Sequence, residues 1–470
     1  MIAPARVAAY EILVAVSAGR ADLPGAIASA RASLPDDRDR ALAAEIATGV
    51  QRFRAALDHL IVQCSKRPID RLDAEIVEIL RLSLYQLLHL TRVPASAVVD
   101  DAVNLAGWAG KRSAAGFVNG VLRAISRTRS SLLLPPRPPV MMAPTDLHAA
   151  LDYLSITLSH PRWLAERWLA RFGFDVAEAW LLFNNRPAPL TLRTNTLLLS
   201  PADLRSRLAE RGITVTPGRY APGSFIVESG HPLRDASASG GWFVVQDEAS
   251  QLVTLLAGPR PGARILDACA SPGGKATALA ATIEPGGYVV ACDVRSRRME
   301  LLRQTVAQTR AHGVRLVQAD LLSPLPFHTR FDCVIVDAPC SGLGTLRRDP
   351  DIRWRRRERD LAPLAETQRR MLGNAAALVA PGGRLVYATC SSEPEENEDV
   401  AHAFLREAAD FEPVDVRTVH PLLTPDLVDE GGYLRTSPHR NGLEAFFGAV
   451  FERRLSSSPA PSPWPLVPSP

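Results

Sequence analysis

Two cysteines in the C-terminal half of the chain lie in surroundings that favour chemistry. Cys340 belongs to the segment DAPCSGLG, and Cys390 to ATCSS, which an acidic run follows. A thiolate with a depressed pKa can add to C6 of a cytosine, so that C5 attacks a methyl sulfonium and loss of the C5 proton then expels the sulfur. Either cysteine alone could be an inert buried thiol, which is the interpretation we keep for the thiols of Cys269, Cys292 and Cys333. Two of them near acidic residues indicate catalysis.

A glycine-containing segment, DACASPGGK, follows a predicted strand and opens a predicted helix. Gly273 and Gly274 would let backbone amides approach a ligand, although an ordinary strand–helix turn has the same appearance. Asp293 ends the next strand, where an acidic residue commonly binds ribose hydroxyls. Asp320 ends the third strand and could accept from an adenine amino group or cap a helix. Together these features predict a site for an adenosine-containing cofactor.

Short apolar strands alternate with helices from Gly241 onward, which predicts a doubly wound, largely parallel α/β sheet. Every motif above ends such a strand, where ligands bind in this fold class. The preceding sequence is different, with helix following helix at the start, including an amphipathic one over 73–90 with Asp70 as its N-cap. We therefore expect a multidomain protein with an all-α bundle over 1–130, a Pro-rich linker over 131–144, a small α+β module over 145–240, an α/β domain over 241–455 and a disordered Pro/Ser tail over 456–470.

Composition excludes several classes of protein. The 470 residues carry a net charge of +4, which permits a nucleic-acid partner without arguing for one. No apolar run is long enough to span a membrane, so we expect no membrane partner. The six cysteines contain no CxxC pair, which favours the reducing cytoplasm over a disulfide framework and indicates no metal site.

The motifs DACASPGGK, DAPCSGLG and ATCSSEPEENE, in this order, resemble the signature motifs of the RNA cytosine-5 methyltransferases, the NOL1/NOP2/Sun family. The helical N-terminal region, ending in GFVNGVLR, resembles a NusB-like domain, and that pairing is typical of the bacterial enzymes that methylate 16S rRNA. The resemblance covers nearly the whole chain except the tail. Ser271 departs from the family, which more often has Ala there, but Ser is small enough to preserve the loop.

This resemblance implies roles for individual residues. Cys390 would be the nucleophile, Cys340 would assist release of the methylated base, and Asp337 would lie between the base and the cofactor, S-adenosylmethionine. Lys275 would lie beside both, as one of only three lysines among 54 basic residues. The residues implied to bind the cofactor are Cys269, Ala270, Ser271, Pro272, Gly273, Gly274, Lys275, Asp293, Asp320 and Asp337.

An arginine-rich segment after Cys340 is the strongest candidate for RNA contact. Arginines bind phosphates, and a tryptophan offers a stacking face. A solvated charged helix is the alternative, since Asp349 and Asp351 partly neutralise the segment. The resemblance adds the N-terminal domain and the 145–240 module as further RNA contacts, and 16S rRNA, unassembled or in an early precursor, as the partner. The predicted RNA-binding residues are Arg347, Arg348, Arg353, Trp354, Arg355 and Arg356.

Other functions compete with this one. A tRNA or 23S rRNA cytosine-C5 methyltransferase would share the motifs, but the NusB-like region argues against it. A non-catalytic RNA-binding or antitermination factor is disfavoured by the intact Lys275, Asp337, Cys340 and Cys390. A nicotinamide dehydrogenase would need a glycine fingerprint that this loop lacks.

Overall fold

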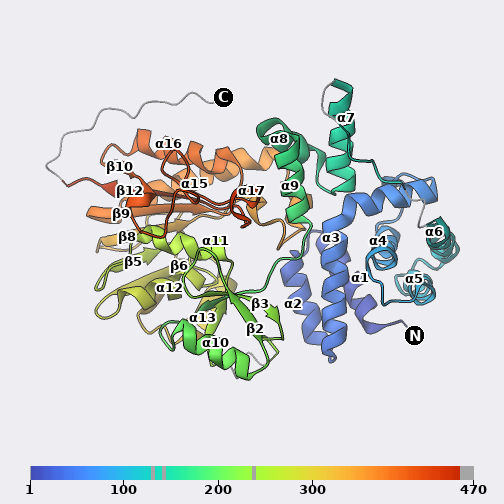
Figure 1. Cartoon of the computed structure of the whole chain (residues 1–470), viewed down its shortest axis with the longest axis horizontal. Helices are drawn as coiled ribbons and strands as arrows, with labels where there is room; N and C mark the ends of the chain where they lie inside the picture. Colours follow the sequence, from blue (N-terminus) through green and yellow to red (C-terminus); the bar gives the residue numbers. More distant parts are fainter. Residues whose placement is uncertain (1, 129–132, 140–143, 235–239, 456–470) are drawn as a thin grey trace. The chain divides into compact units, whose positions relative to one another are not determined.

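The computed structural model describes residues 2–128, 133–139, 144–234 and 240–455, and the chain folds into two units. The first unit comprises Met1–Pro187 and Thr345–Glu358, and the second comprises Ala188–Gly344 and Arg359–Pro470 (Figure 1). The predicted Pro/Ser tail over 456–470 and parts of the predicted linker lie outside the described residues. No helix in the described ranges has both the length and the apolar character that crossing a membrane requires.

Helices form the first unit, as the apolar spacing of the sequence predicts. The predicted helix over 73–90 is α4, and its apolar residues Ile76, Ile79 and Leu80 are buried against the neighbouring helices. The predicted N-cap was wrong, because Asp70 lies in a short 3₁₀ turn and extended Leu72 separates that turn from the helix, which Asp73 precedes. The helices of this unit are α1 (Pro4–Ser17), α2 (Leu23–Ser33), α3 (Asp37–Ser65), α4 (Ala74–His89), α5 (Ala95–Trp108), α6 (Ala115–Thr128), α7 (Pro144–Asp152), α8 (Arg162–Phe172), α9 (Phe174–Asn184) and α14 (Ile352–Arg355).

The arginine-rich segment Thr345–Glu358 packs within the first unit, although its neighbours in sequence belong to the second. The Arg353 side chain is fully buried and donates to the backbone oxygen of Ser159 over 3.0 Å and to Asn185 Oδ1 over 2.9 Å. Its other acceptors are the backbone oxygens of Arg52, Asn184 and Leu346, each at 3.3 Å. Burial lowers the pKa of Arg353 to about 9, so carbonyl dipoles rather than a carboxylate solvate this cation.

The segment therefore differs from the exposed basic strip that its sequence suggests. Arg347 is buried like Arg353, and the indole of Trp354 donates to the backbone oxygen of Gln51 over 2.6 Å. Arg355 is exposed, whereas Arg348, Trp354 and Arg356 are half-buried. The cause is that Arg353 and Trp354 donate to carbonyl groups from distant parts of the chain, which no local pattern reveals.

A small antiparallel sheet opens the second unit, with strand order β2-β3-β1-β4. The Ser200 side chain accepts from the backbone N–H of Asp203, and the Asp203 carboxylate accepts in return, so a capping box starts helix α10. The expected 145–240 module is thus divided, because α7–α9 belong to the first unit and only the sheet with α10 to the second. The elements are β1 (Thr191–Thr194), α10 (Pro201–Glu210), β2 (Thr214–Pro217), β3 (Ser224–Ser229) and β4 (Phe243–Val245), and β4 extends past the expected boundary at 240.

The large sheet has the order β10-β12-β9-β8-β5-β6-β7 with β11 beside β12, and it is parallel from β9 to β7 and antiparallel around β12. Successive side chains of a strand point to opposite faces of this sheet: Ile265 of β5 packs with α12 on one face, and Leu266 packs with α15 on the other. Its elements are α11 (Glu248–Leu252), β5 (Arg264–Asp267), α12 (Gly274–Ile283), β6 (Tyr288–Asp293), α13 (Ser296–Thr309), β7 (Val314–Gln318), β8 (Phe331–Asp337), α15 (Leu361–Ala376), β9 (Val379–Thr389), α16 (Glu398–Glu407), β10 (Phe411–Val414), β11 (Leu434–Arg435), α17 (Pro438–Asn441) and β12 (Phe447–Arg453).

The buried guanidinium of Arg353 yields a prediction about stability. Arg353→Ala removes the donor for several buried acceptors, so the first unit should lose at least about 2 kcal/mol of stability. The exposed Arg357 of the same segment is the matched control, and Arg357→Ala should change stability by no more than about 0.5 kcal/mol. Thermal melting of the wild type and the two variants measures these losses of stability. Equal melting temperatures of the Arg353→Ala and Arg357→Ala variants would show that Arg353 does not hold the segment in place.

Candidate active site

The loop between β5 and α12 has a shape that only glycine permits at one position. Gly273 has φ +109°, and a Cβ there would lie 2.8 Å from Leu302 Cδ1 and 3.2 Å from Thr305 Cβ. The N–H of Ala270 donates to the backbone oxygen of Cys292 over 2.8 Å, which fixes the loop to the end of β6. The predicted cofactor loop is therefore a rigid turn at the carboxyl edge of the sheet.

Asp267 ends β5 beside this loop, and our sequence analysis did not single it out although it is the first residue of DACASPGGK. Its carboxylate is fully buried, and neither oxygen receives a hydrogen bond from a side chain in the described part of the chain, although the backbone N–H of Cys269 lies close enough to favour the charged form. Burial, followed by the charge of Asp337, raises the pKa of Asp267 to about 7. A buried carboxylate in this condition fits a cationic ligand. The signal available from sequence was an acidic residue that ends a strand of buried apolar residues.

The other predicted acidic residues occupy different environments. Asp293 ends β6 and is buried, with Arg298 Nη1 3.8 Å from its Oδ2. Asp320 follows β7, is exposed, and accepts from the backbone N–H of Leu322 over 2.9 Å. Asp320 therefore caps a turn, whereas the alternative considered from the sequence was a helix cap.

Lys275 and Asp337, which the sequence analysis implicated together, form an ion pair in which Nζ and Oδ2 are 2.6 Å apart. The Lys275 side chain is only 12% exposed. Burial by itself would lower the pKa of Lys275, but attraction to Asp337, with smaller contributions from Asp267 and Cys390, outweighs burial and raises it. Lys275 is therefore an ammonium fixed between the cofactor loop and the loop after β8.

Cys340 and Cys390 lie together, with 3.3 Å between their sulfur atoms. Cys340 follows β8 and Cys390 follows β9, so two parallel strands deliver them to the same edge. Both are free thiols and half-buried. The hydrogen bond to Cys390, and then burial, hold the pKa of Cys340 well above its ordinary value. Cys340 therefore retains its proton beside the other sulfur.

A buried carboxylate, Glu396, fastens the two cysteine loops to each other. Its Oε1 accepts from the backbone N–H of Ser341 over 2.8 Å and from Gln368 Nε2 over 3.0 Å. Its Oε2 accepts from Ser391 Oγ over 2.6 Å, and the side chain is fully buried. Ser341 and Ser391 directly follow the two cysteines, so Glu396 fixes the separation of the sulfur atoms. Sequence analysis noted the acidic run after Cys390 without distinguishing this residue within it.

Gly344 adds a second link between the same loops. Its N–H donates to the backbone oxygen of Cys390 over 2.9 Å, and its own oxygen accepts from the Ala445 N–H over 3.0 Å. A Cβ at this position would lie 2.1 Å from the Ala445 oxygen, so only glycine fits. The chain is held here immediately before it passes into the first unit at Thr345.

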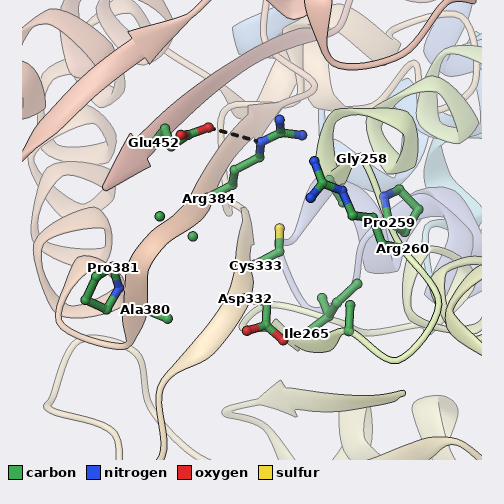
Figure 2. Close-up of a pocket in the computed structure, with 14 residues that line it drawn as sticks. Gly258, Pro259, Arg260, Ile265, Asp332, Cys333, Ala380, Pro381, Arg384 and Glu452 are labelled. Atoms are coloured by element: carbon green, nitrogen blue, oxygen red, sulfur yellow. Dashed lines mark ion pairs between the residues drawn. The ribbon is translucent and has the colours of Figure 1, made fainter. Parts of the chain in front are cut away.

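The cavity drawn in Figure 2 lies elsewhere on the second unit. It encloses about 370 Å³ and is lined by residues that include Gly258, Asp332, Cys333 and Arg384, with Arg384 paired to Glu452. Asp332 and Cys333 lie at the amino end of β8 and Arg384 in β9, opposite the edge that carries the motifs, whereas Gly258 precedes β5 and Glu452 lies in β12. Burial raises the pKa of Cys333 to about 12, as expected for an inert thiol. Within the described residues, no group of three or more His, Cys, Asp or Glu side chains could hold a metal ion.

The sheet order, the glycine loop after β5 and the acidic end of β6 define a methyltransferase of the Rossmann-like class. Its family is 16S rRNA methyltransferase RsmB/F, to which this chain belongs. The model of that family matches residues 253–452, the NusB family model matches residues 3–127, and the ferredoxin-like domain model of RsmF/B-like methyltransferases matches residues 160–234. The expected pairing of a NusB-like domain with a methyltransferase domain is thus confirmed.

Relatives cover almost the entire chain. The Mycobacterium tuberculosis chain Rv1407, whose name describes a methyltransferase, is 37% identical over 469 residues, or 96% of each chain. Ribosomal RNA small subunit methyltransferase B of Pseudomonas putida is 33% identical over 436 residues, which are 91% of this chain and 96% of the relative. The solved structure of PH0851 is similar with a TM-score of 0.78 and 26% identity, and the match covers 96% of this chain and 99% of that one.

The bridging carboxylate yields a prediction about turnover. Glu396→Ala removes the acceptor of three buried hydrogen bonds, so the cysteine loops should separate and the methyl-transfer rate should fall at least roughly tenfold. Cofactor affinity should stay near wild type, because Glu396 touches no residue of the cofactor loop. Single-turnover rates and calorimetry measure the two effects separately.

Two further variants separate positioning from general stability. Glu396→Gln keeps one acceptor oxygen and should recover part of the rate, whereas the exposed Glu407 of α16 is a matched control whose replacement by Ala should change nothing. Wild-type turnover in Glu396→Ala, or equal losses of rate and cofactor affinity, would contradict a positioning role.

Proposed function

We propose that the protein methylates C5 of a cytosine in small-subunit ribosomal RNA, with S-adenosylmethionine as methyl donor and Cys390 as nucleophile. The observation that carries this proposal is the pair of sulfur atoms 3.3 Å apart at the sheet edge that also holds the cofactor loop. Cys390 is near enough to Lys275 to influence its pKa, so nucleophile and ion pair share one site. A non-catalytic RNA-binding factor would have no need of this arrangement.

The substrate proposal rests on the relatives. The Pseudomonas putida relative is named as a ribosomal RNA small subunit methyltransferase, and it matches this chain over nearly its whole length. We therefore favour 16S rRNA, unassembled or in an early precursor, over tRNA and 23S rRNA. Reaction through reduced thiols also favours the cytoplasm as the location.

The residues of the cofactor loop fit S-adenosylmethionine. Its methionyl ammonium would supply a donor for the buried oxygens of Asp267, which lack a side-chain partner among the described residues. Asp293 would accept from the ribose hydroxyls and Asp320 from the adenine amino group, with the loop from Cys269 to Lys275 around the methionyl part. When bound, the cofactor supplies an electrophilic methyl group.

In the first step, the Cys390 sulfur, as the thiolate, would bond to C6 of the cytosine, and the electrons displaced from the C5–C6 double bond would form the bond from C5 to the methyl carbon. The bond from that carbon to the sulfonium sulfur would break at the same time, with its electron pair remaining on the sulfur of the departing S-adenosylhomocysteine. Cys340 would not compete for this role, because its raised pKa keeps it protonated. The Lys275–Asp337 pair would face the base between the nucleophile and the methyl donor and orient it.

The second step would release the product. Besides the hydrogen bond to Cys390, the charge of a Cys390 thiolate is one cause of the raised pKa of Cys340, and that charge disappears once Cys390 is bonded to carbon. Cys340 would then lose its proton to solvent and become able to take the C5 proton. The electrons of the C5–H bond would restore the C5–C6 double bond and expel the Cys390 thiolate.

Within the arginine-rich segment, the more exposed residues would contact the RNA. We propose Arg355 as the most exposed contact and Arg348, Trp354 and Arg356 as partial ones. Arg347 and Arg353 would act indirectly, by holding the segment in place. The helical N-terminal domain and the small sheet would extend the contact with rRNA.

The two cysteines have separable roles, which gives the experiment for this proposal. Cys340→Ala should accumulate a covalent protein–RNA adduct, because methyl transfer proceeds and elimination stalls. The adduct should resist denaturation on a gel and should require S-adenosylmethionine. Cys390→Ala should give no adduct and no methylation, while cofactor binding stays near normal.

The double variant provides the control. It should form no adduct, since no thiol remains to bond the base. An inverted pattern, with adduct in Cys390→Ala and none in Cys340→Ala, would contradict the roles assigned here.

The pKa of Asp267 gives a pH prediction for cofactor binding. Asp267 is protonated below about pH 7 and charged above it, and an α-amino group of the cofactor's kind loses its proton near pH 8. Attraction needs a charged carboxylate and a charged ammonium, so affinity should rise as pH increases through 7 and fall above about 8. Calorimetry across this range tests the expectation.

Asp267→Asn is the matched variant. It should bind S-adenosylmethionine more weakly and should lose the rise through neutrality. The charged groups around Asp267 are Asp337, Lys275 and Asp293. Equal affinities of the wild type for the cofactor below and above pH 7 would show that Asp267 does not contact the ammonium.

A further inference from the structure

Arg193, in strand β1 of the small sheet, is a cation with almost no partners. Its Nη2 donates to Thr277 Oγ1 over 2.9 Å, and its Nε is buried with no acceptor in the described residues. Burial, with no opposing charge, lowers the pKa of Arg193 to about 10. Burying a charge without a partner is costly, so such a group is seldom kept for stability.

Three other buried or largely buried cations of the described chain, Lys275, Arg435 and Arg353, have compensating acceptors. Lys275 pairs with Asp337 over 2.6 Å, and Arg435 is 2.8 Å from Glu398. Arg353 has no carboxylate but donates to a set of backbone oxygens. Arg193 has neither arrangement within the described ranges, which indicates that its partner is a ligand.

The position of Arg193 narrows the choice of ligand. Thr277 lies in the first turn of α12, which begins at Gly274 of the cofactor loop. Gln246, which follows β4, packs its side-chain amide against Gly274, and its Oε1 is also buried without a partner. The start of a helix favours negative charge. An exposed part of Arg193 remains, through which a ligand can reach it.

We propose that Arg193 binds an oxyanion of one of the two substrates at the start of α12. The oxyanion is either the carboxylate of the methionyl group of S-adenosylmethionine or a phosphate of the RNA next to the target nucleotide. A planar guanidinium suits either, because it can donate two parallel hydrogen bonds. This inference rests on the proposed function and adds to it a binding residue from the small sheet.

Arg193→Met removes the charge while keeping much of the side-chain volume, and two binding measurements then identify the oxyanion. The first compares S-adenosylhomocysteine with 5′-methylthioadenosine, which lacks the carboxylate. The second measures affinity for unmodified, in vitro transcribed 16S rRNA at several salt concentrations. We expect a loss of roughly tenfold or more in one of them.

If Arg193 binds the carboxylate, only S-adenosylhomocysteine should bind more weakly, and 5′-methylthioadenosine should be unaffected. If it binds a phosphate, both nucleosides should bind normally, and the slope of log affinity against log salt should fall by about one. The melting temperature should hold or rise in either case, because an unpaired buried charge has been removed. Arg264→Met is the matched control, since Arg264 pairs with exposed Asp332 at the amino end of β5.

Unchanged affinity for both ligands would overturn the proposal. So would a lower melting temperature together with weaker binding of every ligand, 5′-methylthioadenosine included, because that pattern describes a structural residue. Absence of methylation by the wild type would instead refute the proposed function, and the binding measurements would still decide the role of Arg193.

Discussion

The active site depends on one buried carboxylate. Glu396 accepts hydrogen bonds from the residues that directly follow Cys340 and Cys390. It thereby holds the ends of two strands together, so that the two sulfur atoms lie side by side. A charged acceptor with three donors inside a protein forms stronger hydrogen bonds than a neutral one. The proposed reaction uses one thiol to attack the base and the other to release the product, so it requires this separation to be fixed before the base arrives.

Buried cations in different parts of the molecule have different hydrogen-bond acceptors. Lys275 is neutralised by Asp337 and so remains an ammonium in a buried site. Arg353 is solvated by carbonyl oxygens and holds the arginine-rich segment within the first unit. Arg193 has one hydrogen bond within the described residues, to Thr277, and we propose that a ligand supplies a further acceptor. The three cations differ in their immediate acceptors, which supports separate proposed roles in catalysis, architecture and ligand binding.

The sequence was sufficient to predict those features of the site that depend on motifs at the ends of strands. The motifs lie at strand ends, and parallel strands bring their ends together, so the proximity of Lys275, Asp337, Cys340 and Cys390 could be predicted. The division of the 145–240 segment between two units could not, because it depends on contacts between distant residues. The burial of Arg353 was hidden for the same reason, since its acceptors are as far away in sequence as Arg52.

The central claim is that Cys390, and not Cys340, bonds to the base. RNA containing 5-fluorocytidine tests it in the wild-type protein, because fluorine at C5 cannot leave as a proton and the covalent intermediate persists. Digestion of the trapped complex and mass spectrometry then identify the peptide that carries the nucleotide. We expect the modified nucleotide on the peptide containing Cys390, with the Cys340 peptide unmodified. A nucleotide attached to Cys340 would contradict the account.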